Sequence, residues 1–65
     1  MNLKKSFNVA LAMKGLEKKD FASELGISRS RLYAIMNQKR IEPKSLENIS
    51  KTLGMTVSEF IALGE

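Results

Sequence analysis

The sequence predicts an all-α domain of five short helices. Apolar residues recur at helical spacings of one, three and four, and no stretch alternates polar and apolar residues for long enough to indicate a strand. Glycine readily takes the left-handed conformation that ends a helix, and it follows four apolar stretches, at Gly15, Gly26, Gly54 and Gly64. We expect helices over residues 2–14, 18–25, 29–37, 43–53 and 57–63.

The first three predicted helices each carry an apolar stripe on one face. No glycine follows the third stripe, so Asn37, the next best residue for a left-handed stop, is expected to end that helix. The stripes consist of Leu3, Phe7, Ala10 and Leu11, then Phe21, Ala22 and Leu25, then Leu32, Ile35 and Met36.

The last two predicted helices have signals at their starts. Pro43 suits a first helical turn, because its φ is fixed and it has no N–H to leave unpaired. Thr56 and Glu59 have the spacing of a capping box. Helices this short are marginal in isolation, so the stripes are expected to meet in one core. The fourth stripe consists of Leu46, Ile49 and Leu53.

Length and composition exclude several classes of function. A chain of 65 residues is long enough for one domain and too short for two, so we expect residues 1–65 to form a single domain. Because cysteine and histidine are absent, we expect no catalytic residue, metal site, cofactor or small-molecule ligand, and hence no enzyme. The longest apolar run, Val9 to Met13, is far shorter than the roughly 20 residues that span a bilayer, so we expect no membrane span. The absence of cysteine suits a reducing compartment, and we expect a cytoplasmic protein.

The positive charge is concentrated in one part of the chain. Residues 26–41 contain four basic residues and no acidic one, whereas residues 42–65 contain two lysines and four glutamates. Such a window indicates a polyanionic partner, either nucleic acid or an anionic lipid surface. A membrane-surface helix would show one wide apolar face, but here the apolar stripes are narrow and divided among five helices. Nucleic acid is therefore the favoured partner.

The segment 18–37 has the pattern of a helix-turn-helix. Only a tight turn fits between its two predicted helices, so the second helix must cross the first at a large angle. Ala22 is small where the helices would cross, and Gly26 can take a positive φ. Ile27 is expected to fill the space beneath the corner, and the Ser28 hydroxyl is expected to cap the next helix.

Residues 16–37 resemble the helix-turn-helix of the phage Cro and repressor (XRE-like) superfamily. The resemblance extends over roughly residues 3–63, including the C-terminal helices at 43–63. It implies a lambda-repressor-like fold and a dimeric, sequence-specific transcriptional regulator, whose third helix enters the major groove of a palindromic operator. The matching residues are Ala22, Gly26, Leu32 and Ile35, at spacings of four, six and three, followed by Lys39 and Arg40.

Four residues on the outward arc of the third predicted helix are candidates to read bases. The planar fork of Arg29 can donate to guanine O6 and N7 together, and Ser30 can bond any base edge. Ala34 can contact a thymine methyl, and Tyr33 can make either kind of contact. By resemblance, these positions face bases. The alternatives are that Arg29 is a solvent-exposed charge and that Tyr33 is a half-buried core aromatic.

A second set of residues is expected to contact phosphates. Where the family often has glutamine at the start of the second helix, this chain has Lys18, which we expect to act as a point charge on the DNA backbone. Arg31 lies further round the third helix and is either a backbone contact or a solvent-exposed charge. The resemblance implies that Asn37 and the loop after it face phosphates. The full set is Lys18, Ser28, Arg31, Asn37, Lys39 and Arg40.

The last predicted helix has more apolar residues than it can bury in the core of its own subunit. Val57 and Phe60 are expected to point inward, which leaves Ile61 and Leu63 for a partner subunit, joined by Met55. We expect a homodimer that is weak when free and is strengthened by DNA through linkage.

Two functions remain open: a DNA-binding repressor and a helix-turn-helix protein-interaction module of the antitoxin or adaptor type. The acid-free basic window from Arg29 to Arg40 favours the first, because an adaptor has no need of it.

Overall fold

The computed structural model describes residues 2–65, so that Met1, with which the predicted domain range begins, lies outside them. All secondary structure in residues 2–65 is helical, which confirms the predicted all-α class. Every helix boundary lies within one residue of the sequence-based expectation. The helices are α1 (Leu3–Lys14), α2 (Lys18–Leu25), α3 (Arg29–Met36), α4 (Pro43–Thr52) and α5 (Val57–Ala62).

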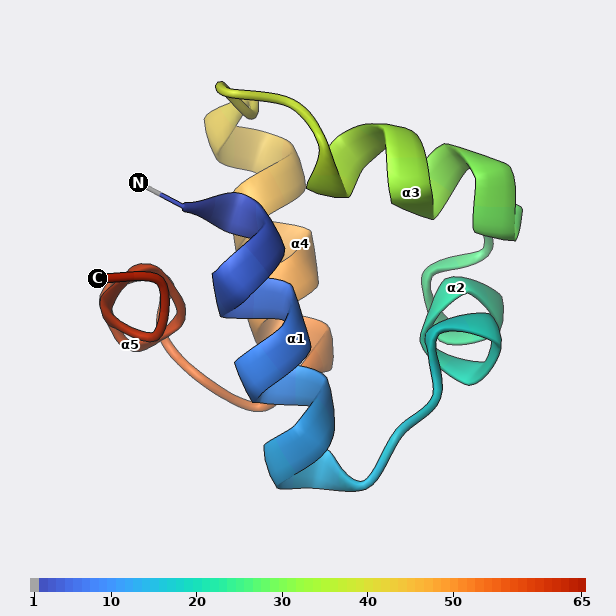
Figure 1. Ribbon diagram of the computed structural model, residues 1–65, viewed down its shortest axis with the longest axis horizontal. Coiled ribbons are helices and arrows are strands. Elements are labelled where there is room, and N and C mark those ends of the chain that lie inside the picture. The colour runs from blue at the N-terminus through green and yellow to red at the C-terminus, as the bar shows by residue number, and fades with distance from the viewer. Residues whose placement is uncertain (1) are drawn as a thin grey trace.

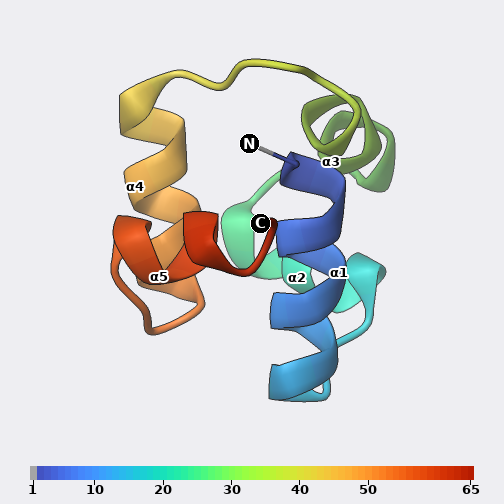
Figure 2. The ribbon, with the colours of Figure 1, turned by 60° about the vertical axis from the view of Figure 1, so that its left-hand side comes forward.

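The first helix is the centre of the arrangement. It packs against α5 on one side and α3 on the other, while α2 packs against both α3 and α4, and α4 packs against α5. Figure 1 shows α1 in front of α4, with α2 and α3 to one side and α5 to the other. In Figure 2 the C-terminal end of α5 lies close to the N-terminal end of α1. The helix-turn-helix is thus held by α1, which packs against α3, and by α4, which packs against α2, while α5 packs against both supporting helices.

Three phenylalanines form the middle of the core, and all are fully buried: Phe7 of α1, Phe21 of α2 and Phe60 of α5. The ring of Phe7 lies between the other two, with centroid separations of 6.1 Å to Phe21 and 5.2 Å to Phe60. Both pairs are edge-to-face, the arrangement that the quadrupoles of aromatic rings favour. These contacts join three helices through one side chain.

The helix ends confirm some sequence expectations and correct others. Gly26 has φ 75°, the left-handed conformation expected after α2. Asn37, expected to be left-handed, has φ −89° instead, so α3 ends without such a residue. Gly64 is not left-handed either. It is buried where a Cβ atom would overlap the Asn2 carbonyl oxygen and the Ser6 hydroxyl, so close approach of α5 to α1 requires glycine here.

The predicted capping box at the start of α5 is confirmed. The Thr56 N–H donates to Oε1 of Glu59 at 2.9 Å, and the Glu59 N–H donates to the Thr56 hydroxyl at 3.1 Å. Hydrogen bonds from the backbone and then the side chain of Thr56 hold the pKa of Glu59 below its ordinary value of 4.5. The cap therefore depends on an ionised carboxylate.

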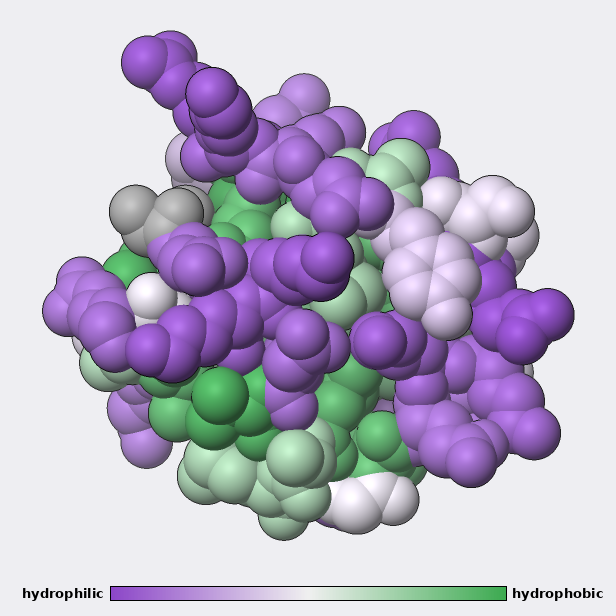
Figure 3. Space-filling view, in the orientation of Figure 1, coloured by the Kyte–Doolittle hydropathy of each residue, from purple (hydrophilic) through white to green (hydrophobic). Residues whose placement is uncertain are grey.

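One large apolar side chain is exposed on α1. Met13 ends the longest apolar run of the sequence, yet it is 64% exposed. Figure 3 shows apolar residues gathered over the C-terminal end of α1.

In the part of the chain described, no helix has the length and apolar character needed to cross a membrane.

Candidate nucleic-acid interface

The two sides of α3 differ sharply. Leu32 and Met36 are buried at 0% and 3% exposure and hold the helix against the core. Tyr33 is 44% exposed and does not belong to the hydrophobic core cluster, which favours an outward-facing role over the alternative of a half-buried core aromatic. All four predicted base-reading residues lie on the exposed part of the helix: Arg29, Ser30, Tyr33 and Ala34.

The turn before α3 fixes where this exposed face begins. The Ile27 N–H donates to the Ala22 carbonyl at 3.0 Å, which closes the end of α2 across Gly26. The Ser28 hydroxyl oxygen then accepts from the Arg31 N–H at 3.1 Å and caps α3, as the sequence predicted. The proton of that hydroxyl stays available to donate, because a serine oxygen can accept one bond and donate another.

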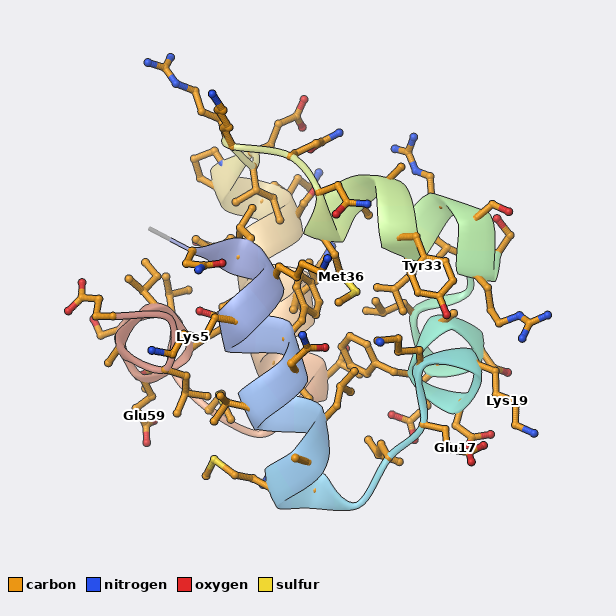
Figure 4. All side chains as sticks on the ribbon, in the orientation of Figure 1. Lys5, Glu17, Lys19, Tyr33, Met36 and Glu59 are labelled. Atoms are coloured by element: carbon orange, nitrogen blue, oxygen red, sulfur yellow. The ribbon has the colours of Figure 1, made fainter. Side chains whose placement is uncertain are left out.

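An open groove of about 610 Å³ lies where α1, the start of α2 and α3 meet; we call it the Lys18 groove. It brings together three residues that sequence analysis singled out separately, Lys18, Arg29 and Tyr33. Figure 4 shows Tyr33 pointing from α3 toward α2. The lining residues are Asn8, Leu11, Ala12, Leu16, Glu17, Lys18, Lys19, Arg29 and Tyr33.

Most of the basic side chains are electrostatically unpaired. Lys19 and Glu17, both well exposed, form an ion pair at 3.4 Å, and Figure 4 shows both at the α2 end of the molecule. No other lysine or arginine in residues 2–65 pairs with a carboxylate. Lys18 and Arg29 therefore keep their charge free for an external anion, whereas an exposed pair such as Lys19 and Glu17 is worth little.

A second open groove, of about 500 Å³, lies at the other end of α3; we call it the Lys4 groove. It contains the predicted phosphate contacts Asn37 and Lys39. Lys4 lies beside them, and the sequence analysis missed it because only packing of α1 against α3 brings it near the loop. The lining residues are Asn2, Leu3, Lys4, Met36, Asn37, Gln38 and Lys39.

Arg31 lies apart from both grooves. It lines a smaller depression of about 150 Å³. The other lining residues are Leu25, Ile27, Ile35, Ser45, Asn48 and Ile49. Residues two apart on a helix point about 200° apart, which places Arg31 across α3 from Arg29 and Tyr33. The expected phosphate contacts are thus divided among different faces. Arg40 is exposed in the loop after α3.

The predicted subunit-contact residues lie at and near α5. Met55, Ile61 and Leu63 are half-buried and pack against the edge of the core. Each keeps part of its surface exposed, and their contact with a second subunit stays a prediction.

Comparison with protein-family models identifies a DNA-binding family for this chain. A family model described as the Cro/C1-type helix-turn-helix DNA-binding domain matches residues 7–64. Comparison with curated proteins returned no match, and neither did comparison with solved structures. The matched range includes the whole of α2 and α3 with the turn between them.

Proposed function

Because the chain belongs to the Cro/C1-type helix-turn-helix DNA-binding family, we propose that it is a transcriptional repressor that binds a palindromic operator as a dimer. The observation that carries this proposal is the exposed face of α3, where Arg29 and Tyr33 share a groove with an unpaired Lys18. We assign the whole of residues 1–65 to one DNA-binding domain, with the helix-turn-helix at 18–37. The site of action proposed is the cytoplasm, at the DNA of a bacterial cell or a phage-infected host.

The shape of α3 suits the major groove. Its eight residues give a length of about 12 Å and, with side chains, a diameter of about 10–12 Å, against a groove about 12 Å wide. Arg29 reads a guanine through O6 and N7, and the remaining exposed positions supply hydrogen bonds or apolar contacts to base edges. These positions are Ser30, Tyr33 and Ala34.

The phosphate contacts proposed lie at both ends of α3. Lys18 and the Ser28 hydroxyl serve the N-terminal end, and Asn37, Lys39 and Arg40 serve the C-terminal end. These contacts fix the position of the protein and add affinity without reading sequence. Arg31 lies across α3 from the groove that holds Arg29 and Tyr33, so we assign it the role of a solvent-exposed charge.

We propose that two subunits pair through Met55, Ile61 and Leu63. A two-fold axis would then place two α3 helices about 34 Å apart, one turn of DNA. The contact is small, so the free dimer is weak, and binding to DNA favours it by linkage. The protein-interaction alternative lacks a specific observation in its favour, whereas the unpaired Lys18 and Lys39 share grooves with residues of α3, as DNA binding requires.

Selection of bound sequences from a random duplex pool tests this function. We expect a palindromic consensus whose half-sites are one DNA turn apart. The Arg29→Ala variant, selected in parallel, is the control and should give a consensus that is degenerate at one position of each half-site. A pool that stays random with the unaltered protein would exclude sequence-specific binding, and a non-palindromic consensus would exclude the symmetric dimer.

A further inference from the structure

We propose that Lys4 of α1 contacts a DNA phosphate, so that the DNA-binding surface extends beyond the helix-turn-helix to the first helix. This inference rests on the proposed function. It starts from the Lys4 groove, in which two segments far apart in the sequence place Lys4 and Lys39 around one depression.

The groove has the chemistry of an anion site. Two lysines and the amide side chains of Asn37 and Gln38 line it, and no acidic residue does. Neither lysine pairs with a carboxylate within residues 2–65. Like charges facing one depression repel each other, and an anion between them removes that repulsion.

Buried apolar residues that line the Lys4 groove strengthen its attraction for an anion. Leu3 and Met36, exposed at 2% and 3%, line it from α1 and α3. Charges beside a buried apolar surface are less screened by water than charges surrounded by solvent. Asn2 is held at the rim, because its side-chain oxygen accepts from the Lys5 N–H at 3.1 Å and caps α1.

In the proposed complex, the Lys4 groove lies at the end of α3 that faces the second DNA strand. Two phosphate backbones border a major groove about 12 Å wide, which matches the length of α3, about 12 Å. The Lys18 groove contains Arg29 from the first turn of α3, and the Lys4 groove contains Met36 from its last turn. A helix lying in the groove with these two ends toward opposite backbones places Lys18 against one strand and Lys4 against the other.

Lys5 provides a matched control. It is the neighbour of Lys4 on the same helix, is equally charged and is also exposed. Consecutive helical residues point about 100° apart, and Lys5 is directed away from the Lys4 groove. Its Nζ donates to the Glu65 carbonyl oxygen at 3.3 Å, and Figure 4 shows it on the α5 side of α1.

The experiment compares Lys4→Ala with Lys5→Ala on the selected operator at several salt concentrations. Lys4→Ala should weaken binding to all duplexes by a similar factor and lower the slope of log K against log salt by about 0.9 per subunit. Lys5→Ala should leave the slope unchanged. Equal losses in both variants would show a diffuse charge effect and overturn the inference. Far-UV spectra verify that both variants remain helical.

A second measurement locates the contact. The operator is prepared with one phosphate at a time replaced by a neutral methylphosphonate. The affinity for each of these operators is measured for the unaltered protein, for Lys4→Ala and for Lys18→Ala. Each variant should become insensitive to neutralisation at the phosphate that it no longer contacts, and the two positions should lie on opposite strands. If Lys4→Ala responds like the unaltered protein at every linkage while Arg29→Ala loses base discrimination, the inference fails and the proposed function stands. Absence of operator binding by the unaltered protein would overturn both.

Discussion

The ε-ammonium group of Lys18 lies over the aromatic ring of Tyr33, with Nζ 5.7 Å from the ring centroid. This cation–π contact joins the first residue of α2 to the exposed face of α3. Lys18 is half-buried, whereas most of the other lysines are exposed. The ring and the charge therefore occupy defined positions relative to each other before any DNA is bound.

The first prediction concerns this pair. In a double-mutant cycle of Lys18→Met and Tyr33→Leu, the losses in unfolding free energy should be non-additive by about 0.5–1 kcal/mol, the size of an exposed cation–π contact. Denaturant unfolding measures the stability of all four proteins. Tyr33→Phe keeps the ring and should preserve the coupling to Lys18. Additive losses would mean that the Lys18 charge and the Tyr33 ring do not stabilise each other.

The second prediction concerns Arg29. Arg29→Ala should lose about 1–3 kcal/mol per half-site against the preferred base pair and much less against substitutes, because a bidentate contact to guanine is specific. Affinities for the operator and its single-base variants check this. Arg31→Ala is the matched control, since Arg31 faces the opposite side of α3. If Arg29→Ala lowers the affinity equally for every variant, its role is electrostatic.

The third prediction concerns the subunit contact. Ile61→Glu places a charge on a half-buried apolar position at the edge of the core, where two subunits are proposed to meet. The variant should stay folded, bind an isolated half-site normally and bind the full palindrome with reduced affinity. Sedimentation of the DNA complex gives the stoichiometry. Undiminished binding of two subunits to the palindrome would place the interface elsewhere.

The fourth prediction concerns pH. The pKa of Glu59 is lowered in the folded state, so its contribution to stability is fully present above about pH 4.5, its ordinary pKa, and is lost as the pH falls through the lower folded value. Glu59→Gln should be less stable than the unaltered protein at neutral pH, and the difference should shrink in acid. Thermal unfolding across that range measures it, with Glu47→Gln on the exposed side of α4 as control. A difference that is constant with pH would exclude the ionised cap.

The fifth prediction concerns Gly64. Alanine at this position should destabilise the fold by about 1–3 kcal/mol, the usual cost of overpacking, because its Cβ would meet backbone and hydroxyl atoms of α1's first turn. Denaturant unfolding gives the value, and the exposed substitution Lys51→Ala serves as control. An unchanged midpoint would show that α5 can move away from α1 without loss.

The fold was largely predictable because its signals are local. Gly26, Ser28 and the Thr56–Glu59 pair each act within a few residues, so spacing alone identified them. Lys4 and Gly64 matter through neighbours that are distant in sequence. The local pattern marked Gly64 only as a left-handed helix end, and its close contact with α1 depends on packing instead.

The candidate site was also predictable only where its signals are local. Helical spacing predicted the exposure of Arg29 and Tyr33, because the buried side of α3 has a clear stripe. The spacing did not reveal the Lys18–Tyr33 contact, which depends on the angle between α2 and α3. Likewise, Met13 ends the longest apolar run of the sequence, but its side chain is 64% exposed.

The row of three phenylalanine rings has a mechanical consequence for a dimer. Phe7 touches Phe21 of α2 and Phe60 of α5, so the DNA-facing helices and the helix proposed to meet the second subunit are braced by the same side chain. In the proposed dimer, the distance between the two α3 helices would then depend on the packing inside each subunit as well as on the subunit contact. A substitution of Phe7 that shifts α5 relative to α2 would therefore change the spacing between operator half-sites that the proposed dimer fits.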